Sequence, residues 1–265
     1  MNNKGLVIIN TITLAVMLFA NFGFNTGLLT NTTVAAVSYK YDTLFTPAGY
    51  AFSIWGVIFL LCSCFTIYQW WLLKHGDANN YIKKTGIWFT VSNIANAAWL
   101  YCWTNDLIGL SVIVILILLV SLCILTVRLR LELDDEPVRN IFFVWWPVAV
   151  YLGWIIVASV ANIAAWLVSI GWHGVDINDE SWTIILITIA TALFVVLIAK
   201  RNLRETAAVG MWAFIAIAVR QWDDHTNVAI TAVVAAVVLL IATGIHAYTN
   251  RHYNVAAKVK KGEWK

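Results

Sequence analysis

The chain has 265 residues, of which 61% are hydrophobic and only 12% are charged, whereas a soluble domain is roughly 25% charged. Several apolar stretches reach the roughly 20 residues that a helix needs to cross a bilayer, and they are too long and too uniformly apolar for barrel strands. The net charge of +3 comes from basic residues at the ends of these stretches, which argues against a nucleic-acid partner. The sequence therefore predicts an all-α, polytopic integral membrane protein in the lipid bilayer.

Eight apolar stretches are expected to span the membrane. In chain order they cover residues 5–22, 49–73, 86–103, 107–127, 141–170, 182–199, 206–222 and 227–248. No small-residue cleavage site is obvious after the first, which favours a retained helix over a signal peptide. The fifth is longer than the bilayer requires and should tilt or project, whereas the seventh is short. The polar segment 23–46 is expected to form a long external loop.

The basic residues divide unevenly between the two ends of these spans. Fifteen of the seventeen Lys and Arg residues fall at one end, and the other end keeps only Lys40 and Arg220. Cytoplasmic loops of membrane proteins are enriched in Lys and Arg, so both termini are predicted in the cytoplasm, with residues 251–265 as a basic cytoplasmic tail. At the opposite face, Arg220 and Asp223 are spaced for an i, i+3 pair at a helix end.

Side chains that many membrane enzymes and pumps use are absent from the middle of the predicted spans. No lysine lies there, which argues against a retinal Schiff base, and no aspartate or glutamate, which argues against a proton-coupled pump. The four cysteines lie in apolar stretches without the usual metal-ligand spacing. Neither a phosphate-binding loop nor a Ser-His-Asp set is evident. The sequence thus favours binding over conventional catalysis, with no catalytic residue, metal site or required cofactor.

The fifth span carries the most informative pattern. Trp154, Ala158, Asn162 and Trp166 recur every four residues and so lie along one helix face. An amide within hydrocarbon needs a hydrogen-bond partner, so Asn162 should face protein, water or a ligand. This face either packs against a neighbouring helix or lines a pocket between helices, and the residues alone favour packing.

The third span has a similar face. Asn96, Trp99 and Trp103 fall at i, i+3 and i+7, with Asn93 one turn before them. Two amides and two indoles on one helix argue for an internal, partly polar surface. Trp103 lies near the membrane boundary, where an interface anchor is the expected role.

Three motifs, in chain order, resemble those of one known family. The fifth span fits the Tyr-x-x-Trp-x-x-x-Ala-x-x-x-Asn core of the fifth helix of TspO/MBR proteins at Tyr151, Trp154, Ala158 and Asn162. These are the tryptophan-rich sensory proteins, related to the mitochondrial translocator protein (peripheral benzodiazepine receptor). The segment FTPAG at 45–49, with Trp55 beyond it, is similar to the family's loop entering helix two. Asn96 and Trp99 resemble its Asn-x-x-Trp in helix three.

The resemblance covers residues 1–172 and departs from the family pattern in three ways. The usual Pro-Pro of the entry loop is Pro47 followed by Ala48, and the Pro expected just before Tyr151 is Val150. The family has five helices, whereas this chain adds about three more transmembrane helices over residues 173–250.

The resemblance implies a five-helix bundle around a pocket that opens toward the loop between helices one and two. Family members bind tetrapyrroles such as protoporphyrin IX and haem, some bind sterols or benzodiazepine-like drugs, and porphyrin photodegradation has been proposed. Carried onto this chain, it implies ligand-binding roles for Phe45, Pro47, Trp55, Asn96, Trp99, Tyr151, Trp154, Ala158 and Asn162. Trp154 and Trp99 would stack on the ligand, Asn162 and Asn96 would bond its polar edge, and the 45–49 loop would cover it.

Three functions remain open at this point. The first is a receptor or binding protein for a flat hydrophobic small molecule, either a tetrapyrrole (porphyrin or haem, as ligand rather than cofactor) or a sterol-like compound, with a sensory or regulatory role. The second is a transporter or exporter of a small lipophilic molecule, with the added helices as its moving half. The third is an enzyme that modifies porphyrin photochemically, although no acid–base pair supports conventional turnover. The sequence is also compatible with a homodimer.

Overall fold

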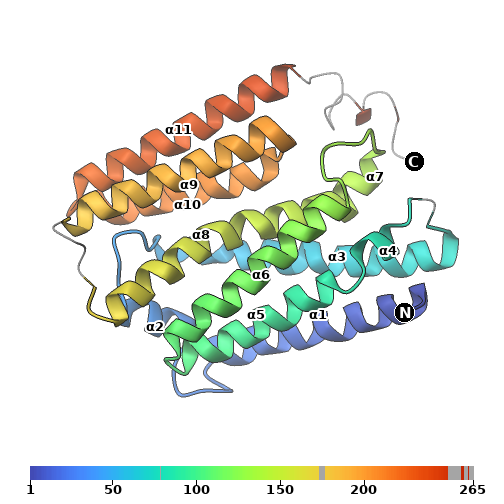
Figure 1. Ribbon diagram of the computed structural model, residues 1–265, viewed down its shortest axis with the longest axis horizontal. Helices are drawn as coiled ribbons and strands as arrows, with labels where there is room; N and C mark the ends of the chain where they lie inside the picture. The colour runs from blue at the N-terminus through green and yellow to red at the C-terminus, as the bar shows by residue number, and fades with distance from the viewer. Residues whose placement is uncertain (78, 173–176, 250–257, 260–261, 263–265) are drawn as a thin grey trace.

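The computed structural model describes residues 1–77, 79–172, 177–249, 258–259 and 262, and the described residues contain helices, turns and loops but no strand (Figure 1). The eight predicted stretches correspond to α1 (Asn3–Asn25), α3 (Ile54–His75), α5 (Trp88–Thr104), α6 (Ile108–Arg128), α8 (Trp146–Ser169), α9 (Asp179–Arg201), α10 (Arg204–Gln221) and α11 (Thr226–Thr249). The all-α prediction is confirmed.

Six segments of the described chain are long and apolar enough by themselves to cross a membrane: Asn3–Asn25, Gly49–His75, Ile108–Arg128, Val138–Ser169, Asp179–Arg201 and Thr226–Thr249. The other two long helices are α5, which has 17 residues, and α10, which has charged residues in its first and last turns. Both pack among the longer helices, α5 against α1 and α6, and α10 against α8, α9 and α11. The chain is therefore a polytopic membrane protein.

Short helical elements lie at the ends of several spans. The predicted external loop contains α2 (Val34–Lys40), a 3-10 turn η1 (Gly49–Ser53) precedes α3, and α4 (Tyr81–Thr85) lies between α3 and α5. Ahead of α8, α7 (Val138–Asn140) runs into a π-helical turn, η2 (Ile141–Trp145). Pro147 in the first turn of α8 has no N–H to donate to the preceding turn. The π-helical turn η2 forms the first five residues of the predicted fifth span, which helps to explain its extra length.

Helix α8 is the centre of the bundle, since it packs against α3 and α6 on one side and against α9 and α10 on the other. Its contact with α10 depends on Gly153, where an added Cβ would lie 2.6 Å from the Thr206 carbonyl oxygen and 2.9 Å from the Val209 Cβ. One turn away, the Thr206 hydroxyl donates a hydrogen bond to the Ala149 carbonyl at 2.9 Å. Small residues allow such close approach of membrane helices. The hydrophobic core thus continues from α8 into the three later helices.

Helices α1, α3 and α5 are joined by a buried polar seam. Asn10 donates from Nδ2 to Gln69 Oε1 at 3.0 Å and accepts at Oδ1 from the Thr90 hydroxyl at 2.8 Å. Farther along, Asn93 Nδ2 donates to Thr13 Oγ1 at 3.3 Å. Hydrogen bonds between membrane helices add to van der Waals packing, so the seam fixes the register of α1 against α5.

At the basic end of the bundle, the loop after α6 is tied to the turn between α9 and α10. Glu132 and Arg204 approach to 3.9 Å, and Asn202 Nδ2 donates to Glu132 Oε2 at 3.2 Å. Burial raises the pKa of Glu132 above its ordinary value, and the nearby Glu205 carboxylate raises it further. These contacts hold the start of α10 against the loop that follows α6.

Candidate functional site

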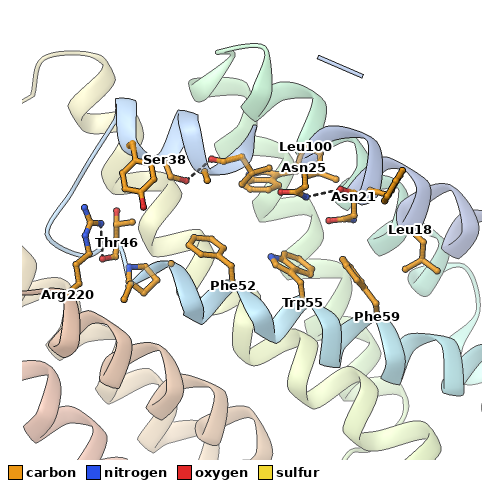
Figure 2. A pocket seen from close by; sticks show the side chains of 18 residues that line it. Leu18, Asn21, Asn25, Ser38, Thr46, Phe52, Trp55, Phe59, Leu100 and Arg220 are labelled. Atoms are coloured by element: carbon orange, nitrogen blue, oxygen red, sulfur yellow. Dashed lines mark hydrogen bonds between the residues drawn. The ribbon is translucent and has the colours of Figure 1, made fainter. Parts of the chain in front are cut away.

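A cavity of about 740 Å³ lies where α1 and α5 end and α3 begins (Figure 2). Its walls come from the last turns of α1, from α2, from the 46–49 loop, from η1 and α3, and from α5, with one residue of α10. Its volume lies within the roughly 300–1,000 Å³ usual for small-molecule sites. The loop between α1 and α3 therefore covers a space large enough for an organic ligand.

One wall of this cavity is aromatic. Phe52, Trp55 and Phe59 line it from η1 and α3, because their i, i+3, i+7 spacing puts them on one helix face. The rings of Trp55 and Phe59 stack, with centroids 5.5 Å apart and planes 26° apart. Trp99 of α5 lines the same cavity. Flat apolar molecules can stack on such rings.

A smaller cavity of about 60 Å³ adjoins the first and shares Pro47, Trp55 and Trp99 with it. Trp154, Ala158 and Asn162 of α8 line the smaller cavity but not the larger one. Of the nine predicted site residues, the structure thus places six around these two adjoining spaces. They are Pro47, Trp55, Trp99, Trp154, Ala158 and Asn162.

Trp154 lies behind the aromatic wall. Its side chain is only 3% exposed, and its ring meets Phe52 and Trp55 edge-on, with centroid distances of 5.8 and 6.3 Å. Trp154 therefore holds the orientation of the two rings that face the larger cavity.

The Asn162 amide is engaged by two neighbouring helices. Its Oδ1 accepts a hydrogen bond from Trp99 Nε1 at 2.7 Å, and its Nδ2 donates to Ser111 Oγ at 2.9 Å. Trp99 also stacks on Trp103, with centroids 5.4 Å apart and planes 21° apart. The α8 face that carries Asn162 therefore does both of the things considered above: it packs against neighbouring helices and it borders a pocket. Asn162 fixes the plane of Trp99.

Two further predicted residues lie outside both cavity linings. Asn96 is fully buried, and its Oδ1 accepts from Asn21 Nδ2 at 2.7 Å, so that Asn21 rather than Asn96 reaches the cavity. Tyr151 is 1% exposed; its hydroxyl lies 3.8 Å from Met17 Sδ and its ring meets Trp55 edge-on at 5.9 Å. Both side chains support residues that face the cavity.

Phe45 differs from the other predicted residues. Its side chain is fully buried and borders a separate space of about 200 Å³ that Trp172 and Trp182 also line. It anchors the entry loop in the core, and the cover of the larger cavity begins one residue later, at Thr46.

The covering loop is fastened to α10. The hydrogen bonds run from Arg220 Nη2 to Asp42 Oδ2 (2.6 Å), from Arg220 Nη1 to the Thr46 carbonyl (3.2 Å), from Gln221 Nε2 to the Leu44 carbonyl (3.0 Å), from the Ala48 amide to the Ala216 carbonyl (3.1 Å) and from Trp212 Nε1 to the Ala51 carbonyl (3.1 Å). We call these five bonds the α10 clamp.

The predicted pairing of Arg220 with Asp223 is wrong, because Arg220 forms its ion pair with Asp42 of the covering loop instead.

Helix α2 is fastened to the end of α5 and to the turn that follows it. Lys40 forms an ion pair with Asp106, which raises the pKa of Lys40 and lowers that of Asp106. Trp103 Nε1 donates to the Val34 carbonyl at 3.1 Å. Trp103 is only 4% exposed, so the interface role predicted for it is wrong; its position under α2 buries it.

Sequence reasoning missed several cavity residues for which a signal was present. Asn21 is an amide within the first apolar stretch, the same signal that singled out Asn162. Phe52 and Phe59 share a helix face with Trp55. Nothing in the local sequence, by contrast, connects Arg220 with a cavity formed by α1, α3 and α5.

A known family described as TSPO-like protein matches residues 7–245 of the chain. No curated protein and no solved structure matches it. The family match includes α9 and α10 and most of α11, so the helices beyond residue 172 lie within the matched region. With a match over most of its length and a helical membrane architecture, the chain belongs to the TSPO-like protein family.

Proposed function

We propose that this membrane ligand-binding protein is a receptor for a flat hydrophobic molecule of the tetrapyrrole or sterol-like class, bound beneath the 46–49 loop. The observation that carries the proposal is the cavity of about 740 Å³ with Phe52, Trp55 and Trp99 in its walls. A flat ligand placed there would remove apolar area from water and stack on indole and phenyl faces.

The residues take different roles in this proposal. Phe52, Trp55 and Trp99 contact the ligand, and Pro47 covers it. Trp154, Tyr151, Asn96, Asn162 and Ala158 hold these walls in place or border the small adjoining space. In this proposal the protein is a sensor, and binding of the ligand is itself the signal.

Replacing Trp55 with alanine tests the site. We expect the affinity for protoporphyrin IX to fall by about tenfold or more, because one stacking face and its buried area are lost. Binding is measured on purified protein in detergent through the absorbance of the porphyrin, so that removing an indole does not alter the signal.

The matched control for this experiment is Trp222→Ala, which removes an indole that is 54% exposed and lies at the end of α10 outside the cavity. Its affinity should equal that of the wild type. Equal losses in both variants, or no loss in Trp55→Ala, would show that porphyrin binds elsewhere.

The proposed orientation puts the cavity mouth on the outer face and both termini in the cytoplasm. In Figure 1 the start of α1 and the end of α11 lie at the same end of the bundle, the end that carries most of the basic residues. In a background whose four cysteines are replaced by alanine, Lys40→Cys should react with a membrane-impermeant maleimide in intact cells. Lys200→Cys should react only after permeabilisation. The reverse pattern would overturn the orientation.

A transporter of small lipophilic molecules is the alternative function. It requires the later helices to move relative to the first five, whereas the α10 clamp ties the two parts together at the cavity mouth. This contact supports the receptor. Protoporphyrin flux into proteoliposomes that contain the protein, above that of empty vesicles, would favour the transporter instead.

A further inference from the structure

The two ends of the larger cavity differ in charge: Arg220 lies at one end, and the other end is lined by apolar side chains and the neutral amides of Asn21 and Asn25. In Figure 2, Arg220 and Thr46 lie at one end, and Leu18 and Phe59 lie at the other, with Phe52 and Trp55 between them. Among the described residues that line this cavity, Arg220 is the one charged side chain. A ligand that fills the space would therefore meet a guanidinium at one end and aromatic rings along its length.

The guanidinium of Arg220 has N–H donors that its hydrogen bonds to Asp42 and Thr46 do not use. Its side chain is 22% exposed, and its hydrogen bonds to Asp42 and to the Thr46 carbonyl use two of the five N–H groups that a guanidinium carries. The Asp42 side chain is 48% exposed, so this partner lies toward solvent while Arg220 borders the cavity. Nearby, Ser38 and Thr46 add hydroxyl groups to the same lining.

We infer that the cavity selects an anionic amphiphile: a flat apolar body with a carboxylate at one end, which Arg220 binds. The inference rests on the proposed function, since it names the class of ligand for that site. A planar guanidinium matches a carboxylate in geometry, and hydrogen bonds between two charged groups are stronger than neutral ones. The carboxylate would compete with Asp42 for Arg220, and the apolar body would lie along Phe52 and Trp55. Helix α10, beyond the five-helix part, thus supplies the group that determines ligand charge.

The test compares pyrenebutyric acid with pyrenebutanol. Both are flat fluorescent probes, but the first ends in a carboxylic acid and the second in a neutral hydroxyl group. Binding to purified protein in detergent at neutral pH is followed by energy transfer from tryptophan to pyrene, with protein-free micelles as the baseline. The measured quantity is the ratio of the two dissociation constants in each variant, because comparison between variants cancels the different partition of the probes into micelles.

We expect Arg220→Gln to weaken binding of the acid by about tenfold or more and to leave the alcohol nearly unchanged. The control is Lys40→Gln. Lys40 is the other Lys or Arg residue predicted at the outer end of the spans, and it does not line the cavity. This variant should leave the ratio of the two dissociation constants as in the wild type. Asp42→Asn should tighten binding of the acid, because it removes the protein's own competing carboxylate while keeping Arg220.

Each other outcome counts against the inference. If Arg220→Gln and Asp42→Asn weaken both probes equally, Arg220 only holds the loop, and the ligand-charge assignment is wrong while the proposed function stands. The same conclusion follows if the ratio is unchanged in Arg220→Gln. If neither probe binds to the wild type, the inference fails, and the protoporphyrin titration decides separately whether the cavity is a ligand site.

Discussion

Gly153→Ala is expected to lower the unfolding temperature of the purified protein by several degrees. The added methyl group would lie 2.6 Å from the Thr206 carbonyl oxygen, which belongs to the α10 backbone and cannot turn aside as a side chain could. The two helices must separate, at a cost of about 1–3 kcal/mol for an overpacked contact. Since α10 carries the clamp on the entry loop, the affinity for protoporphyrin IX should fall in the same variant.

The matched control is Gly244→Ala in α11, where an added Cβ has nothing within 4 Å. Alanine is favoured over glycine in a helix by about 1 kcal/mol, so this variant should unfold at the wild-type temperature or above it. Thermal unfolding in detergent, followed by circular dichroism, checks both. A Gly153→Ala protein as stable as the Gly244→Ala protein would mean that α8 and α10 do not meet as described.

Asn162→Leu is expected to lower both stability and porphyrin affinity. The leucine leaves Trp99 Nε1 and Ser111 Oγ without the bonds that Asn162 provides, and an orphaned buried polar group costs about 1–3 kcal/mol. The Trp99 ring loses the bond that fixes its plane, so one wall of the cavity is no longer held in place.

A double-mutant cycle separates this indirect role from a direct contact between Asn162 and ligand. Phenylalanine at position 99 has no N–H to satisfy, so adding Trp99→Phe to Asn162→Leu should cost less than the sum of the two single changes. Additive losses of porphyrin affinity would instead assign Asn162 to the ligand itself, as the sequence alone suggested. Unfolding temperature and affinity are read on all four proteins.

The spans could be predicted because hydrocarbon imposes the same demand on each of them. A crossing helix must be apolar over roughly 20 residues, and its few amides must find partners inside the protein. That demand predicts that Asn96 and Asn162 are internal, and both are buried and hydrogen-bonded to other helices. The α2 helix was not expected, since seven residues in a polar loop carry no comparable signal.

The contacts around the cavity could be predicted only in part. Helix periodicity indicates which residues share a face, but it does not say which of two facing residues lies nearer a cavity. Trp154 and Phe52 meet edge-on, and only the packing of three helices determines that Phe52 faces the larger space. The contact of Arg220 with Thr46 joins positions 174 residues apart, for which local sequence carries no information.

The separation between Asp42 and Arg220, 178 positions along the chain, also bears on the order of synthesis. The segment that covers the cavity is made early, between α1 and α3, whereas the helix that fastens it, α10, begins only at Arg204. Chains are synthesised from the N-terminus at about 5–20 residues per second. The loop is therefore made long before α10, the helix to which the α10 clamp fastens it. Fastening of the cover therefore requires α10 to be in place, and a ribosome-bound intermediate that ends at α8 lacks the five bonds of the α10 clamp.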